Sequence, residues 1–218
     1  MPSRSGQTMP NLVQGAQFVL AAHRVSQLPA DLGAEVAFAG RSNAGKSSAL
    51  NALTNHKGLA RTSKTPGRTQ QMVAFALPPL TQGEGEPPLV ARLIDLPGYG
   101  YAKVPEELRA HWKQEIDAYL HQRQSLRGVV LIADIRHPLK EFDRMMLDFC
   151  FATGLPCHLL LTKADKLSRN QAAQALAAMR RSFPDGLHAT AQIFSSSAGT
   201  GVDEARERVA ELLRTPRE

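Results

Sequence analysis

The sequence predicts a three-layer α/β sandwich, in which helices cover both faces of a mostly parallel six-stranded sheet with one antiparallel edge strand. From Glu35 onward, short aliphatic runs alternate with segments of helical period, which is typical of mainly parallel sheets. The runs 128–133 and 157–161 predict the centre of the sheet, because strands covered on both faces are apolar throughout. A glycine-rich turn also separates the first strand from the first helix.

The strands are expected in the order of the aliphatic runs. Residues 72–77 and 89–94 are separated by a loop rich in proline and glycine, which predicts a hairpin and so the antiparallel strand. The other predicted strands are 35–39, 128–133, 157–161 and 188–194.

Five helices are expected between these strands and after them. Pro105, followed by two glutamates, fits the first turn of a helix, where a missing N–H costs little and negative charge is favoured. Ser168 and Gln171 form a capping box, which predicts the start of another helix. The remaining helices are predicted over 46–54 and 142–151 and along the apolar stripe of Val202, Ala205, Val209 and Leu212.

Residues 31–218 are expected to form a single domain, because a chain of 218 residues is near the size at which one large domain is common. Residues 1–30 are expected to be an N-terminal appendage. Four apolar residues of this appendage fit a short amphipathic helix: Leu12, Phe18, Val19 and Ala22.

The composition is that of an ordinary globular protein, with 43% apolar and 21% charged residues. No apolar run approaches the roughly 20 residues that cross a bilayer, and the N-terminus lacks the pattern of a secretory signal. Cys150 and Cys157 fit reduced core thiols, so we expect a cytoplasmic protein. The net charge of +6 is compatible with a polyanionic partner, but many proteins that bind no nucleic acid carry a similar charge.

The segment 40–47 fits the pattern G-x-x-x-x-G-K-S between a predicted strand and a predicted helix. Glycines let backbone N–H groups turn toward phosphates, Lys46 can meet the β- and γ-phosphates, and the Ser47 hydroxyl can bind Mg²⁺. The sequence therefore predicts a P-loop NTPase fold. The predicted phosphate loop comprises Gly40, Arg41, Ser42, Asn43, Ala44, Gly45, Lys46 and Ser47.

A second element of the site follows the third predicted strand. Asp95 stands at the carboxyl end of that strand, where a carboxylate can reach the same metal ion. Gly98 has no side chain, so its N–H can approach a γ-phosphate closely. The segment consists of Asp95, Leu96, Pro97 and Gly98, for which an ordinary β-turn is the alternative.

The segment 162–165 predicts the choice of base. The carboxylate of Asp165 can accept two hydrogen bonds from the N1–H and N2 amino group of guanine, whereas adenine would leave that charge unpaired. Thr162 can connect this loop to the phosphate loop, and Lys163 can lie over the base. This base-reading group comprises Thr162, Lys163, Ala164 and Asp165, and the pocket would be completed by Phe194, Ser195 and Ser196, with backbone N–H groups directed at the guanine oxygen.

Together these segments resemble those of the translation-factor-related (TRAFAC) class of small GTPases. With 62–70 (TSKTPGRTQ) and 95–103 (DLPGYGYAK), they are similar to the bacterial EngB (YihA/YsxC) family over about 18–213. The resemblance implies a cytoplasmic, Mg²⁺-dependent GTPase that acts in assembly of the large ribosomal subunit and is needed for normal cell division and septation.

The resemblance also implies that the Thr69 hydroxyl binds Mg²⁺ in the GTP state, although Thr62 and Thr65 are nearby alternatives. The metal ligands are then Ser47, Thr69 and Asp95, and the residues expected to act on the transferred phosphate are Lys46, Thr69 and Gly98. The loop around Thr69 would contribute Gly67, Arg68, Thr69, Gln70 and Gln71 to the nucleotide site.

Tyr99 stands where many small GTPases have a glutamine that orients the attacking water. We therefore expect slow intrinsic hydrolysis, and related GTPases suggest that Asn43 could hold K⁺ beside the phosphates. Tyr99 and Tyr101 could stack on RNA or pack on the neighbouring helix, and the second interpretation is favoured.

Three functions are compatible with these residues. The first is a monomeric GTPase switch, which binds precursors of the large ribosomal subunit and ribosomal RNA. The second is a nucleotide-gated ribosome-binding factor with negligible turnover of its own. The third is a P-loop kinase for a small molecule, which would leave the segment 162–165 without a role.

Overall fold

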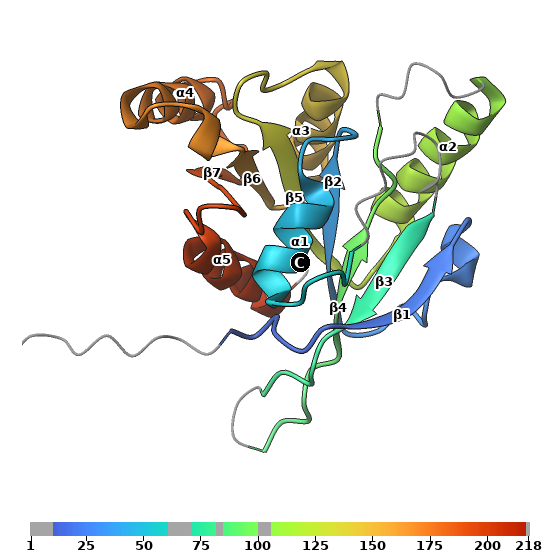
Figure 1. Cartoon of the computed structure of the whole chain (residues 1–218). Coiled ribbons are helices and arrows are strands. Elements are labelled where there is room, and N and C mark those ends of the chain that lie inside the picture. The colour runs from blue at the N-terminus through green and yellow to red at the C-terminus, as the bar shows by residue number, and fades with distance from the viewer. Residues whose placement is uncertain (1–10, 61–70, 82–84, 100–105, 217–218) are drawn as a thin grey trace, which may run out of the picture.

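The computed structural model describes residues 11–60, 71–81, 85–99 and 106–216. Its described strands form one seven-stranded sheet in the order β1-β3-β4-β2-β5-β6-β7, with helices on both faces (Figure 1). The strands are β1 Gln17–Ala22, β2 Ala34–Gly40, β3 Met72–Ala76, β4 Ala91–Asp95, β5 Leu126–Asp134, β6 Cys157–Thr162 and β7 Ala189–Ile193.

In the described part of the chain, the helices confirm the five that the sequence predicts. The first covers 46–54, as expected, because it begins directly after the glycine-rich turn and ends at Asn55 in a left-handed conformation, with φ 52°. The helices are α1 Lys46–Thr54, α2 Glu106–Gln122, α3 Glu141–Thr153, α4 Arg169–Arg181 and α5 Val202–Arg214, and the short 3₁₀ helices are η1 Val25–Gln27 and η2 Ala164–Lys166.

The predicted hairpin is also confirmed, because β3 pairs with β4 in antiparallel register. The remaining central pairs, β4 with β2 and onward to β7, are parallel. Parallel strands end at the same edge of a sheet, so the loops after β2, β4, β6 and β7 meet along one rim.

The N-terminal helix expected from Leu12 to Ala22 is wrong. Gln17–Ala22 instead forms β1, which pairs with β3 and raises the strand count from six to seven. The open edge of β3 offers a row of backbone donors and acceptors, and pairing with it outweighs the local apolar pattern. Phe18 and Val19 are accordingly exposed rather than buried on a helix face. The domain boundary at residue 30 stays a prediction.

Two apolar layers hold the sheet between the helices. Alternate residues of β2 point to opposite faces, so that Val36 and Phe38 pack in the layer with α1 and α5, and Ala37 and Ala39 pack in the layer with α2, α3 and α4. Both cysteines are buried free thiols, as expected. Among the described residues, no helix combines the length and apolarity that crossing a membrane requires.

Candidate nucleotide-binding site

The predicted phosphate loop has the backbone conformation that its sequence requires. Gly45 has φ 101° and is the N-cap of α1, with no side chain bonded to the helix N-terminus. A Cβ on Gly40 would lie 2.7 Å from the carbonyl oxygen of Ile132, so only glycine fits there. Asn43 also has a positive φ, 62°. The first turn of α1 therefore presents backbone N–H groups to the rim, where an anion is favoured.

Lys46 and Asp95 meet at the centre of this rim as an ion pair in which both side chains are largely buried. The sequence predicts Lys46 as a phosphate ligand and Asp95 as part of a magnesium site, and the structure brings them together. Buried charges are stable only when paired, so an incoming phosphate and divalent cation would have to replace each partner of this ion pair.

One buried polar atom of the loop points to a ligand. The hydroxyl of Ser42 is buried and has no hydrogen-bond partner, which is uncommon for a buried polar group. It lies in the loop between Gly40 and Gly45, so a phosphate oxygen or a water bound there could satisfy it. The arrangement therefore fits a nucleotide phosphate chain.

A cavity of about 140 Å³ lies beside the phosphate loop, at the carboxyl ends of β6 and β7. It brings together the predicted base-reading segment and the loop after β7. Ser48 and Ser197, which the sequence analysis did not select, also line it. The lining residues are Gly45, Ser48, Thr162, Lys163, Asp165, Lys166, Phe194, Ser196 and Ser197.

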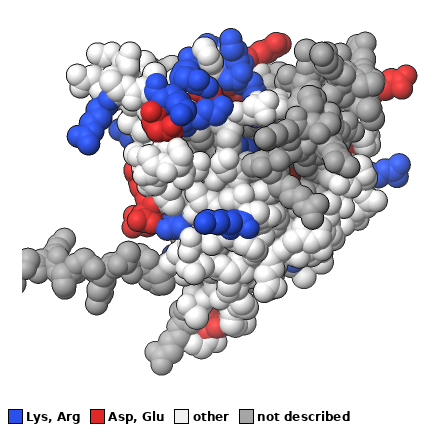
Figure 2. Space-filling view, viewed as in Figure 1, with Lys and Arg blue, Asp and Glu red and all other residues white. Residues whose placement is uncertain are grey.

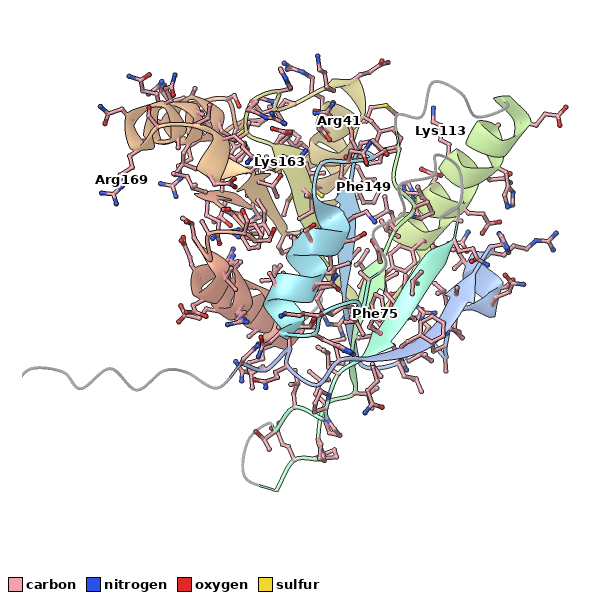
Figure 3. The ribbon with its side chains drawn as sticks, in the orientation of Figure 1. Arg41, Phe75, Lys113, Phe149, Lys163 and Arg169 are labelled. Atoms are coloured by element: carbon pink, nitrogen blue, oxygen red, sulfur yellow. The ribbon has the colours of Figure 1, made fainter. Side chains whose placement is uncertain are left out.

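Thr162 connects the base-reading segment to the phosphate loop, as expected, and Lys163, which the sequence predicts to lie over the base, bonds the same loop. The Thr162 hydroxyl bonds the Ala44 carbonyl, and the Lys163 ammonium donates to the Asn43 carbonyl at 2.6 Å. Lys163 also lies 3.0 Å from a carboxylate oxygen of Asp134, at the end of β5. The hydrogen bond to Asn43 and the ion pair with Asp134 hold the ammonium group of Lys163, which also lines the cavity, and Figure 3 labels this side chain.

Asp165 is oriented by the loop after β7. The Ser195 hydroxyl donates to its Oδ1 at 2.6 Å, and Lys166 lies 3.2 Å from Oδ2. These contacts hold the pKa of Asp165 below its usual range, and the hydrogen bond from Ser195 has the largest effect. The carboxylate is exposed to solvent and ionised, and can therefore accept hydrogen bonds from a ligand.

The loop after β7 is only partly arranged as predicted. Phe194 is buried, and its carbonyl accepts the Ala164 N–H at 3.2 Å. The Ser195 N–H, predicted to face the base, donates instead to the Thr200 carbonyl at 2.9 Å. The contribution of Ser195 to the pocket is therefore its hydroxyl, and Ser196 lines the cavity wall.

Several predicted residues are not part of the described structure or have other contacts. Thr62, Thr65, Gly67, Arg68, Thr69, Gln70, Tyr101 and Lys103 lie outside the described residues, so their roles stay predictions. Gln71 contacts the side chain of His23 at 2.9 Å. Leu96 and Pro97 are buried, so they hold the loop between Asp95 and Gly98 in place.

Tyr99 packs on a helix, which is the interpretation that the sequence analysis favours, and that helix is α3. Its ring stacks on Phe142 at 3.8 Å and its hydroxyl donates to Asp143 at 2.6 Å. Asp143 also receives a bond from Arg41 of the phosphate loop, at 3.2 Å. The sequence analysis did not select Asp143, because it belongs to none of the motifs.

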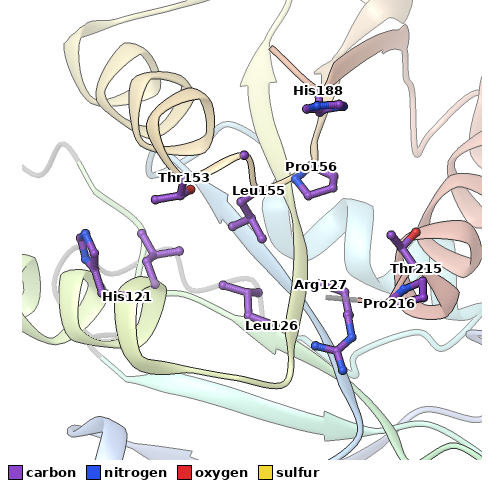
Figure 4. Close-up of a pocket in the computed structure, with 11 residues that line it drawn as sticks. His121, Leu126, Arg127, Thr153, Leu155, Pro156, His188, Thr215 and Pro216 are labelled. Carbon is purple, nitrogen blue, oxygen red and sulfur yellow. The ribbon is translucent and has the colours of Figure 1, made fainter. Parts of the chain in front are cut away.

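A larger cavity, of about 410 Å³, lies at the opposite end of the sheet, where β5, β6 and β7 begin (Figure 4). None of the motif residues lines it. Its walls include Leu126, Arg127, Pro156, His188 and Thr215.

Comparison with known proteins gives a consistent match. The model of a protein family described as 50S ribosome-binding GTPase matches residues 35–163. The chain is 56% identical over 200 residues to the probable GTP-binding protein EngB of Stenotrophomonas maltophilia, covering 91% of this chain and 95% of that protein. It is 54% identical to the EngB protein of Xylella fastidiosa, with 90% and 93% covered.

Solved structures share the fold. A crystal structure of a probable GTP-binding protein EngB matches with a TM-score of 0.62 at 22% identity, over 83% of this chain and 99% of that one. A structure of Era in complex with MgGDPNP and nucleotides 1506–1542 of 16S ribosomal RNA matches with a TM-score of 0.62 at 19% identity, over 86% of this chain and 59% of that one.

Proposed function

This chain belongs to the EngB family of P-loop GTPases, which hydrolyse GTP, and we propose that it is a nucleotide-gated switch in assembly of the large ribosomal subunit. In such a switch, GTP orders the loops that dock on the partner, and hydrolysis releases them. The observation that carries the proposal is the cavity beside the phosphate loop with the ionised Asp165 at its edge.

Asp165 is the residue proposed to select guanine. Its two oxygens can accept the N1–H and N2 amino donors, and the hydroxyl of Ser195 fixes the plane of the carboxylate. Adenine has an acceptor at N1 and no amino group at C2, so it would leave the carboxylate unsatisfied. The stem of Lys163 would cover one face of the base.

The phosphate end is proposed to use the ion pair at the rim. Lys46 would move from Asp95 to the β- and γ-phosphates, and Asp95 would then face Mg²⁺ together with the hydroxyls of Ser47 and Thr69. A magnesium ion bound there would neutralise charge on the phosphate oxygens. Few protein ligands are needed, because Mg²⁺ usually keeps several waters. The N–H of Gly98 is proposed to contact the γ-phosphate.

Slow intrinsic hydrolysis is part of the proposal. The buried side chain of Tyr99 bonds Asp143, so it does not supply the amide that orients water in many small GTPases. A potassium ion held near Asn43 is proposed to assist. If the single-turnover rate is equal in KCl and NaCl, the potassium site is excluded.

The proposed partner is the large ribosomal subunit or its precursor. Support comes from the description of the matching family and from the charge of the rim, where Lys and Arg side chains gather over the region of α4 and the loop before α3 (Figure 2). Clustered cations favour the RNA phosphate backbone by releasing counterions. The roles in cell division and septation, and the cytoplasmic location, are proposed from the family alone. Exposed basic residues here are Arg136, Lys140, Arg144, Lys166 and Arg169.

Nucleotide choice tests the site directly. We expect GDP to bind with Mg²⁺ at least about a hundredfold more tightly than ADP, and Asp165→Asn to lose that preference. An asparagine amide can donate to the C2 oxygen of xanthine, so Asp165→Asn should gain affinity for xanthosine diphosphate. Asp148→Asn, at an exposed position of α3, is the matched control. Preferential ADP binding by the wild type would contradict the guanine site and favour the kinase.

Ribosome binding tests the wider role. The wild type should co-sediment with large subunits in the presence of a non-hydrolysable GTP analogue and be released by GDP. GTP turnover measured with and without these particles separates the two switch models, because a factor with negligible turnover would show no stimulation. Equal co-sedimentation with GDP and the GTP analogue would contradict a nucleotide-gated switch.

A further inference from the structure

Asp143 is a buried carboxylate that lies outside every nucleotide-binding motif. It belongs to the first turn of α3 and its side chain is 0% exposed. Burying a carboxylate is costly unless it is paired and hydrogen-bonded. Asp143 meets that requirement by accepting from Tyr99 on one oxygen, and from Arg41 and the Lys140 N–H on the other. The three side chains of this clamp, Arg41, Tyr99 and Asp143, therefore depend on one another.

The side chain of Tyr99 is fixed by this clamp. Its ring stacks on Phe142, its hydroxyl is 2.6 Å from Oδ1 of Asp143, and the whole residue is only 7% exposed. Burial and the neighbouring carboxylate raise the pKa of Tyr99 well above its usual value. The phenol thus remains a neutral donor throughout the working pH range.

The backbone of Tyr99 is fixed as well, and to the phosphate loop. The Tyr99 carbonyl accepts the Ser42 N–H at 2.8 Å, next to a parallel bridge between Arg41 and Tyr99. Gly98 lies beside the same loop, since a Cβ on it would be in ordinary van der Waals contact with the Ser42 backbone, at 3.6 Å from the nitrogen. The backbone bond of Tyr99 therefore keeps Gly98, the residue before it, next to the phosphate loop.

Arg41 fixes the other side of this contact. Its Nε bonds Asp143 and its Nη2 donates to the His137 carbonyl at 2.7 Å, so the second residue of the phosphate loop is bonded to the segment that leads into α3. Figure 3 shows Arg41 close to α3 on the rim that also carries Lys163. A single carboxylate thus connects both loops that flank the γ-phosphate position.

We propose that Asp143 is a positioning residue for the triphosphate: through Tyr99 and Arg41 it holds Gly98 against the phosphate loop before GTP arrives. The proposal rests on the proposed contact between the Gly98 N–H and the γ-phosphate. Preorganised donors cost no reordering at the moment of binding, so they strengthen it. GDP lacks the group that Gly98 would meet, so its affinity should depend much less on Tyr99 than that of GTP does.

The test compares two buried tyrosines whose hydroxyl groups each donate to a buried carboxylate. Tyr99→Phe keeps the ring on Phe142 and removes the hydroxyl bonded to Asp143. Tyr119→Phe makes the same change at the far end of the sheet, where the Tyr119 hydroxyl donates to the buried Glu35 at 3.2 Å. Affinities for GDP and a non-hydrolysable GTP analogue are measured by calorimetry with Mg²⁺.

We expect Tyr99→Phe to weaken binding of the GTP analogue by about tenfold, which is the order of one hydrogen bond to a charged group. The affinity for GDP should change by less than about twofold. Tyr119→Phe should leave the ratio of the two affinities unchanged. An unchanged ratio in Tyr99→Phe, or an equal change in both variants, overturns the proposal.

Asp143→Asn supplies an independent variant, because it keeps the size of the side chain but removes the negative charge to which both Tyr99 and Arg41 donate. Asp143→Asn should lower the affinity for the GTP analogue relative to that for GDP. The double variant should lower this ratio by less than the product of the two single effects. Independent effects in the double variant contradict the clamp. A wild type that binds neither nucleotide contradicts the proposed function itself, whereas normal binding with an insensitive ratio contradicts only the clamp.

Discussion

The hydroxyl of Ser195 donates a 2.6 Å hydrogen bond to Oδ1 of Asp165, which lines the cavity beside the phosphate loop. The same hydroxyl oxygen accepts the Ala198 N–H at 3.2 Å, which fixes its direction. Ser195 therefore acts on the base through Asp165. It determines both the orientation and the proton affinity of that carboxylate.

Ser195→Ala should weaken GDP binding by about tenfold, because a charged acceptor loses a donor and its orientation. The affinity for ADP should change little, so the preference for guanine falls. Titrations of both nucleotides into the variant and the wild type measure this. Ser182→Ala, which removes a hydroxyl bonded to the Met179 carbonyl at the end of α4, is the control. An unchanged GDP affinity would show that Ser195 does not orient the carboxylate.

The same pair predicts a pH dependence. The pKa of Asp165 is below its ordinary value of 3.8, first because of the Ser195 bond, so the ionised form persists to low pH. GDP binding should thus be full above that ordinary value and fall as the pH drops through the lowered pKa. In Ser195→Ala the fall should begin at a higher pH. Affinity–pH curves that superimpose for the two proteins would contradict this.

Removal of the metal ion should show whether Asp95 acts on GDP binding through Mg²⁺. EDTA is expected to weaken GDP binding to the wild type by at least about tenfold, because the diphosphate charge is then neutralised by Lys46 alone. Asp95→Asn should bind GDP more weakly with Mg²⁺ and respond much less to EDTA. Fluorescent GDP titrations with and without EDTA measure both. Asp148→Asn should keep the full wild-type response.

His158 should make stability depend on pH. It is 3% exposed, and its Nδ1 and Nε2 lie 2.8 Å from the Thr190 hydroxyl and from Oε1 of Gln192. Burial is the main reason why its pKa falls from 6.5 to about 4. This contribution is fully present above pH 6.5 and is lost as the pH falls toward 4, because the unfolded chain takes up a proton first.

Between pH 7 and pH 5, this residue should lower the free energy of unfolding by about 2 kcal/mol. Urea unfolding of the wild type at the two pH values measures the loss, which should be much smaller in His158→Gln. Replacement of the exposed His188 by Gln should leave the loss of unfolding free energy between the two pH values as large as in the wild type. An equal loss in wild type and His158→Gln would assign the effect to other groups.

Much of the fold follows from local sequence. The bounds of α1 follow from a strand, a glycine turn and a helical run that are consecutive in the chain. The edge strand β1 does not, because the strand that it pairs with in the described structure, β3, is about 50 residues away, and the apolar Phe18 and Val19 are exposed rather than buried. Pairing at an open edge has no local signal.

The candidate site divides in the same way. Lys46 and Asp165 belong to motifs whose spacing is set by a phosphate or a base, so sequence alone predicts them. Asp143 is reached from Tyr99 over 44 positions and from Arg41 over 102, and no spacing rule links them. The buried Glu35 shows the same limit, since it lies in an apolar run and pairs with Arg123 over 88 positions.

The position of Tyr99 predicts the result of a restoring substitution. Small GTPases that use a glutamine here need its amide beside the attacking water. In this structure the side chain at position 99 points toward Phe142 and Asp143. A glutamine on the same backbone would follow that direction and lose the stacking.

We therefore expect Tyr99→Gln not to raise the single-turnover rate of GTP hydrolysis by more than about twofold, less than 1 kcal/mol in activation free energy. Saturating nucleotide removes any effect on affinity, and Tyr99→Phe in the same assay separates loss of the hydroxyl from gain of the amide. An increase of tenfold or more in Tyr99→Gln alone would mean that this side chain reaches the attacking water. The slow intrinsic rate would then be due to the tyrosine itself, and the clamp on Asp143 would have to open before each turnover.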